Sequence, residues 1–247
     1  MTALLRTLVA VALALTIAGV PAQAATNQLE QRLSQLSERG SGEAAYHLGM
    51  LYHMGLAGVE KDPRRAFALF KLAADRGDPL GAYKVGCYYD GQGEGVVESN
   101  PTLALRYKLI AAEAGYALAQ QDVAIHFLNE SNDAGAIRWL EAAAAQGSRT
   151  PLLILGLLYR GIEPQDAVVL PKVPKDVVKG WAYLLLSARD VPEMTRAYEA
   201  ELAKLPAEQQ RLVRAFVATW KDKPSRLTEQ DGINEAYKLA GLPVPNK

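Results

Sequence analysis

Three histidines, one cysteine and a glycine-rich turn are the residues of this sequence that could take part in chemistry. The histidines are His47, His53 and His126. His47 and His53 lie six positions apart, a spacing that does not bring two imidazoles to one metal ion on a helix, and there is no His-Glu-x-x-His segment. We therefore predict neither a metal site nor a cofactor.

The glycine-rich stretch 91–95, Gly-Gln-Gly-Glu-Gly, is only faintly similar to a phosphate-binding loop. It lacks the lysine, contains an acidic residue and follows an expected helix instead of a strand. Cys87 has no activating base placed beside it, so a small packing residue is the better interpretation than a nucleophile. Gly-x-Ser-x-Gly is also missing from the sequence. These patterns predict a protein that is not an enzyme.

The overall composition is that of a globular protein. The chain has 247 residues, of which 49% are hydrophobic and 22% charged. The 27 basic and 27 acidic residues leave no positive excess, which argues against a nucleic-acid partner. A single cysteine excludes an intramolecular disulfide framework.

Residues 1–24 have the pattern of a secretory signal peptide. Arg6 precedes the uncharged apolar run Leu8–Val20, and Ala22-Gln-Ala24 matches a small-x-small cleavage site. A membrane anchor is the alternative, but a spanning helix needs about 20 apolar residues. We expect cleavage after Ala24, a periplasmic or secreted protein, and no stable membrane span in the mature chain.

The elements that would position any site come from an internal repeat. Three segments share apolar residues, a glycine and a final tyrosine at matching positions: Ala45–Tyr52, Ala82–Tyr89 and Leu152–Tyr159. A glycine inside a helix costs about 1 kcal/mol relative to alanine. The recurrence of Gly49, Gly86 and Gly156 therefore indicates positions where two helices approach closely.

A second motif follows each of these segments. It contains small-residue pairs, at 73–74, 111–112, 143–144 and 187–188, and after the first three pairs it ends at Gly77, Gly115 and Gly147. The unit is thus a helix A, a loop, a helix B and a glycine stop. Such a unit buries its apolar face only against its neighbours, so we predict an all-α, right-handed solenoid of antiparallel helix pairs.

This pattern resembles the Sel1-like repeat family, a relative of the tetratricopeptide repeats. The first repeat carries the family's residues at Ala45, Leu48, Gly49, Tyr52, Gly55, Gly58, Val59, Asp62, Ala66, Ala73, Ala74 and Gly77. The third departs from it, with Asp122 and Val123 in place of Leu-Gly. The resemblance implies a scaffold that binds other proteins, and repeat-packing roles for Gly49, Tyr52, Gly86, Tyr89, Gly156 and Tyr159.

The resemblance also suggests an alternative function. Cysteine-rich secreted members of the family, with paired cysteines, are associated with β-lactamase-like activity. The single Cys87 makes this chain a poor match to that subgroup. A secreted hydrolase acting on cell-wall or β-lactam substrates therefore remains an alternative, as does a structural building block of an oligomer.

The expected organisation has four parts: a signal peptide at 1–24, an N-terminal capping helix at 25–42, about four repeats at 43–189 and a helical cap at 190–247. The last repeat loop carries an insertion at 161–175 with three prolines, either a partner-contacting loop or a spacer that packs its own valines on the body. Thr228-x-x-Asp231 is similar to a capping box that opens a last helix ending near Leu239. A separate functional domain is the alternative to the cap.

Helix A positions that do not face the stack form the predicted partner-binding surface, on the concave side of the solenoid. These positions are Tyr46, His47, Met50 and His53 in the first repeat and Tyr83, Lys84 and Asp90 in the second. Tyrosine suits a binding surface because it offers a large contact area with few rotatable bonds. The alternative is that the tyrosines only pack between repeats or lie on an ordinary surface. We thus expect a non-catalytic scaffold of the cell envelope with a protein or peptide partner.

Overall fold

The computed structural model describes residues 22–93, 95–162 and 173–245. Within these ranges it contains thirteen α-helices, one short π-helical turn and no strand, so the predicted all-α solenoid is confirmed. Helix α2 (Ala22–Glu38) comes first. The helix pairs are α3 (Gly42–Met54) with α4 (Pro63–Asp75), α5 (Pro79–Cys87) with α6 (Pro101–Glu113), α7 (Ala117–Asn129) with α8 (Asp133–Ala145), and α9 (Arg149–Arg160) with α10 (Val177–Ala188). The turn η1 (Tyr88–Gln92) extends α5.

Each helix B begins at an aspartate or asparagine that caps it. The side chains of Asp62, Asn100, Asn132 and Asp176 each accept a hydrogen bond from the backbone N–H three residues later, at 2.9–3.1 Å. The backbone N–H of the same residue reaches back to helix A, as in Asp176 N to Tyr159 O at 2.8 Å. Because the loop of each repeat ends at a capping residue that is hydrogen-bonded to helix A, the last loop can hold an insertion without moving α9 and α10 apart.

The repeated glycines lie where helix A crosses helix B. A Cβ atom on Gly49 would be 2.7 Å from Phe70 Cε1, and one on Gly156 would be 2.8 Å from Leu184. At Gly86 the added atom would meet Lys108 Cγ at 2.8 Å. Real Cβ atoms do not approach other atoms this closely, so a side chain at these positions would push the paired helices apart.

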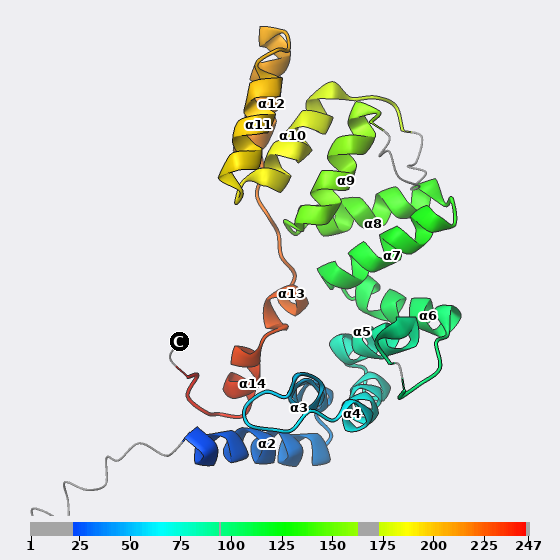
Figure 1. Ribbon diagram of the computed structural model, residues 1–247, viewed down its shortest axis with the longest axis vertical. Coiled ribbons are helices and arrows are strands. Elements are labelled where there is room, and N and C mark those ends of the chain that lie inside the picture. The colour runs from blue at the N-terminus through cyan, green and yellow to red at the C-terminus, as the bar shows by residue number, and fades with distance from the viewer. Residues whose placement is uncertain (1–21, 94, 163–172, 246–247) are drawn as a thin grey trace, which may run out of the picture.

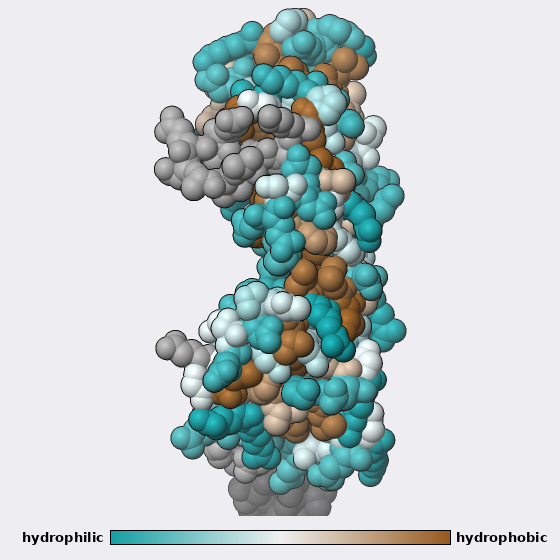
Figure 2. Space-filling view, turned by 90° about the vertical axis from the view of Figure 1, so that its right-hand side faces the viewer, coloured by the Kyte–Doolittle hydropathy of each residue, from teal (hydrophilic) through white to brown (hydrophobic). Residues whose placement is uncertain are grey.

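The helix pairs stack into a crescent whose core is continuous from α2 to α10 (Figure 1). Its outer side is largely hydrophilic, with an apolar band near the middle (Figure 2). At the far end, α11 (Pro192–Leu202) and α12 (Ala207–Thr219) pack on α10 and bury Leu202 and Val213. These two helices cover the end of the stack.

The last part of the chain does not belong to that cap. After α12 the chain leaves the end of the solenoid and runs back along the open side of the crescent (Figure 1). It forms α13 (Arg226–Gln230) and α14 (Ile233–Leu239), and α14 packs on α2 and α3. The expected cap of residues 190–247 is therefore divided between the two ends of the solenoid.

Two of the predicted features fall largely outside the described residues. Residues 1–21 of the expected signal peptide are not among them, nor are residues 163–172 of the loop insertion. Helix α2 begins at Ala22, so the expected cleavage site after Ala24 lies in its first turn. Among the residues that are described, no helix combines the length and the apolarity needed to cross a bilayer.

Candidate interaction site

The returning segment, residues 222–242, is called the strap. It follows the inner side of the crescent from α8 to α2 (Figure 1). Its first contact is Asp222, whose carboxylate pairs with Arg189 Nη2 at 2.5 Å and accepts a hydrogen bond from Trp220 Nε1 at 2.9 Å. The Arg189 guanidinium lowers the pKa of Asp222 below its ordinary value. The strap is thus tied at its start to the end of α10.

Gln146, which follows α8, binds the strap near the middle of the crescent. Its Oε1 atom accepts hydrogen bonds from Ser225 N at 2.9 Å and from Thr228 Oγ1 at 2.8 Å. Its Nε2 atom donates to Gly115 O at 2.8 Å and to Gln120 Oε1 at 2.9 Å. These four bonds fix the orientation of the amide, so Gln146 presents a positioned acceptor to the strap.

Thr228 also caps a helix of the solenoid. Helix α7 begins after Tyr116, whose side chain makes no capping bond. Thr228 Oγ1 takes that role and accepts a hydrogen bond from Ala117 N at 3.2 Å. One of the free N–H groups at the start of α7 is therefore satisfied by a residue far away in sequence.

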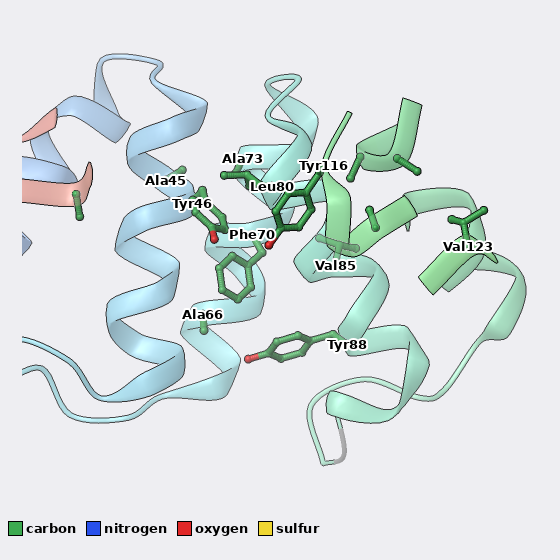
Figure 3. Packing of buried hydrophobic residues seen from close by; sticks show 14 of the residues in the cluster. Ala45, Tyr46, Ala66, Phe70, Ala73, Leu80, Val85, Tyr88, Tyr116 and Val123 are labelled. Atoms are coloured by element: carbon green, nitrogen blue, oxygen red, sulfur yellow. The ribbon is translucent and has the colours of Figure 1, made fainter. Parts of the chain in front are cut away.

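Asp231 is held between two tyrosines of different repeats. Its Oδ1 accepts a hydrogen bond from the hydroxyl of Tyr46 on α3, and its Oδ2 accepts one from the hydroxyl of Tyr116. Both tyrosines are almost completely buried, and their rings lie beside Phe70 and Leu80 (Figure 3). Burial, and then the charge of Asp231, raise the pKa of both tyrosines above its ordinary value, so they remain protonated donors.

Helix α14 provides the apolar part of the contact. Ala236, Tyr237 and Ala240 are buried against the first helices of the chain. A small cavity of about 40 Å³ remains between α14 and α3, lined by the following residues: Tyr46, His47, Met50, Leu56, Asp231, Gly232, Ile233 and Ala236. Among the residues that the structure describes, none forms a hydrogen bond with His47 Nε2, and burial lowers the pKa of His47 to about 4. His47 is therefore neutral beside two strap carboxylates, Asp231 and Glu235.

The structure divides the predicted partner-binding residues into two groups. Tyr46, His47 and Met50 lie under the strap. The surface that we expected to be open at Tyr46 and His47 is not open, because Asp231 and α14 cover it and leave these two side chains 1% and 3% exposed. The prediction of a capping box at Thr228-x-x-Asp231 is wrong, because Ser225 caps α13 and Asp231 follows the end of that helix.

The remaining predicted residues lie away from the strap. His53 Nδ1 is 3.0 Å from the hydroxyl of Tyr88, so His53 contributes to packing between the first two repeats. Lys84 lies over the ring of Tyr83, with Nζ at 5.9 Å from the ring centroid. Tyr83 packs edge-on against the ring of Tyr116, with ring centroids 5.0 Å apart.

A second polar cluster surrounds Lys108. Its Nζ atom pairs with Asp90 at 2.5 Å and with Asp122 at 2.9 Å, and Asp122 also accepts a hydrogen bond from Tyr83 at 3.3 Å. Asp122, which replaces the leucine of the repeat pattern, thus neutralises a largely buried lysine.

Cys87 is buried nearby, and burial raises the pKa of its thiol. Across the described ranges, no three His, Cys, Asp or Glu side chains form a group that could hold a metal ion.

The sequence analysis missed Gln146 and Tyr116, and it assigned Thr228 and Asp231 to a capping box instead of to contacts with the solenoid. Each contact joins elements that are far apart in sequence, so no local spacing marks it. The repeated start of helix A was the available signal for Tyr116, which stands where the other A helices have a polar residue at the N-cap position: Ser41, Asp78 and Ser148.

Comparison with known proteins identifies the repeats. Residues 42–78, 79–116, 124–148 and 170–190 match the family described as Sel1 repeat. This chain is a Sel1 repeat protein. Sel1 repeat proteins are generally non-catalytic scaffolds for protein interactions. The predicted family is therefore confirmed.

This chain spans only part of the length of each similar protein, about half of the two solved structures and 11% of the curated relative. A Sel1 repeat protein of Oxalobacter formigenes has a similar solved structure, with 25% identity, a TM-score of 0.58, and coverage of 69% of this chain and 47% of that one. The antigen c5321 of uropathogenic Escherichia coli, described as having an SLR fold, shows 21% identity over 87% of this chain and 51% of that one, with a TM-score of 0.47. Chitin synthase regulatory factor 3 of Schizosaccharomyces pombe is 32% identical over 107 residues, which are 41% of this chain and 11% of that protein.

Proposed function

We propose that this Sel1 repeat protein is a non-catalytic scaffold of the cell envelope that holds a peptide segment of a partner protein on the inner side of its solenoid. The observation that carries this proposal is that the inner side already holds a peptide segment, the strap of the same chain. Gln146 binds a backbone N–H of the strap, and two tyrosines bind its carboxylate. These are contacts through which solenoids hold extended ligands.

The envelope location rests on the sequence of residues 1–24. We expect the protein to be exported and cleaved after Ala24. N-terminal sequencing of the protein purified from its native cells tests this directly. A mature chain that begins at Ala25 supports the proposal, and an intact start with cytosolic recovery contradicts it.

Capture of a partner from envelope extract tests the binding function. The bait is the full chain carrying Asp231→Asn, which weakens the strap and leaves the solenoid residues unchanged. The matched bait adds Gln146→Ala to it. The control is Asp190→Asn, which removes the same charge from a side chain that is 91% exposed. Asp190 lies 3.8 Å from Arg189 Nε, whereas Arg189 Nη2 pairs with Asp222 of the strap at 2.5 Å.

We expect Asp231→Asn to enrich a specific protein above the level seen with Asp190→Asn. Addition of Gln146→Ala should reduce that enrichment by about tenfold, which corresponds to about 1.4 kcal/mol. Circular dichroism should show equal helix content in all three baits. The proposal fails when no protein is enriched, or when the enrichment does not depend on Gln146.

A further inference from the structure

The polar contacts of the strap separate into those that any peptide could make and those that need particular side chains. Lys223 N donates to Ala145 O at 2.9 Å, and Ser225 N donates to Gln146 Oε1 at 2.9 Å, so both contacts use only the backbone of the strap. Thr228 and Asp231 instead contribute their side chains. Specificity of the site therefore depends on a hydroxyl and, three residues later, a carboxylate.

The carboxylate position is the more selective of the two. Tyr46 and Tyr116 offer two hydroxyl donors to one residue. The ring of Tyr46 is fixed by packing beside Phe70 (Figure 3), and the ring of Tyr116 by edge-on packing against Tyr83. A carboxylate has two oxygens and only accepts hydrogen bonds, so it satisfies both donors at once. An amide in the same place would turn its N–H₂ group toward one tyrosine hydroxyl and lose a charge-assisted bond.

The middle of the strap can be exchanged more easily than its end. No residue of α13 is fully buried, whereas α14 buries Ala236 and Tyr237. Residues 225–231 are thus held mainly by hydrogen bonds, and a peptide that carries the same donors and acceptors can form the same bonds in their place. A second peptide with the same side chains can compete for the site.

We propose that the strap site recognises an acidic peptide of a partner protein, with a Ser or Thr followed three residues later by an Asp or Glu, and that this peptide displaces the strap. This inference rests on the proposed scaffold function and names the class of its partner segment. The partner's carboxylate takes the position of Asp231 between Tyr46 and Tyr116, and its hydroxyl takes the position of Thr228 at the start of α7. In the free protein the strap is an intramolecular competitor.

The test uses a synthetic fluorescein-labelled peptide with the sequence of residues 222–242 as the probe. It is titrated against the full-length mature protein, as wild type, Asp231→Asn and Asp190→Asn, and fluorescence anisotropy reports binding. A second probe has asparagine at the position of Asp231. Thr228→Val supplies an independent way to weaken the strap should Asp231→Asn fail to fold.

We expect the acidic probe to bind Asp231→Asn about tenfold more tightly than wild type, because the competing strap is weaker. Asp190→Asn should behave as wild type, and the asparagine probe should bind Asp231→Asn about tenfold more weakly than the acidic probe. Tyr116→Phe in the Asp231→Asn background should reduce the preference for the acidic probe. Equal binding of both probes, or equal binding to all three proteins, overturns the proposed recognition.

The two experiments separate this inference from the scaffold function. Capture of an envelope protein by Asp231→Asn together with no preference for the acidic probe overturns the peptide chemistry and leaves the scaffold. Preference for the acidic probe without a captured protein supports the recognition chemistry and contradicts the envelope partner.

Discussion

Tyr46 donates a hydrogen bond to Asp231, although 185 positions separate these residues in the sequence. Tyr46 lies in the first repeat, and Asp231 lies beyond the helices that cap the last one. The contact therefore links the two ends of a solenoid whose repeats otherwise contact mainly their neighbours. It also explains why a residue expected to bind partners is buried in the free protein.

Asp231→Asn should release the strap. Hydrogen bonds to a charged group contribute about 1.5–3 kcal/mol, and this variant weakens two of them. We expect the free energy of unfolding to fall by about 2 kcal/mol, and trypsin to cleave after Arg226 and Lys238 faster than in wild type. Asp190→Asn serves as the control, and equal cleavage rates in the two variants would contradict the assignment.

Thr228→Val keeps the shape of the side chain and removes the hydroxyl. The N–H of Ala117 then loses its cap, so stability should decrease by about 1 kcal/mol, as is usual for loss of a helix cap. Thr219→Val is the matched control, because the Thr219 hydroxyl bonds to backbone carbonyls of its own helix, α12. Urea unfolding of both variants measures the difference, and an effect no larger than that of the control argues against capping by the strap.

Gly49→Leu should destabilise the first repeat through overpacking. Even the first atom of the new side chain would lie 2.7 Å from Phe70 Cε1. We expect a loss of about 2 kcal/mol or more in thermal unfolding. Gly232→Ala is the comparison, since a Cβ there meets nothing within 4 Å. A melting temperature unchanged in Gly49→Leu would show that the helices do not cross at this glycine.

The buried imidazole of His47 should make the folded state sensitive to acid. Its pKa is about 4 in the folded protein and 6.5 when exposed, so the folded state binds fewer protons between these values. The stability that neutral His47 provides is complete above about pH 6.5 and is lost as the pH falls toward 4. The facing carboxylates of Asp231 and Glu235 oppose this shift.

We expect the free energy of unfolding to be about 2 kcal/mol lower at pH 5 than at pH 7 through His47. His47→Phe should remove that part of the pH dependence and leave the part due to His53, whose pKa is also lowered by burial. Guanidinium unfolding at both pH values provides the comparison. The same pH dependence in the variant as in wild type would contradict the role of His47.

The repeats could be predicted because their determinants are local. Gly49 and Gly86 recur at matching positions, and the asparagine or aspartate that caps each helix B comes at a fixed point of the unit. The strap could not be predicted in this way. Its contacts join Asp231 to Tyr46 and Thr228 to Ala117, and a hydrogen bond between distant residues leaves no periodic trace in the sequence. The local pattern Thr228-x-x-Asp231 instead suggested a capping box, because a threonine followed three residues later by an acid is also the pattern that caps the start of a helix.

Hydrogen exchange of the strap tests most directly the claim that the inner side of the solenoid holds a peptide segment through its two tyrosines. The measurement compares wild type with Tyr46→Phe/Tyr116→Phe, which keeps both rings and removes both donors. The account predicts that amides of α13 and α14 exchange at least about tenfold faster in the double variant, while those of α12 are unchanged. Equal protection of α13 and α14 in the two proteins would contradict it.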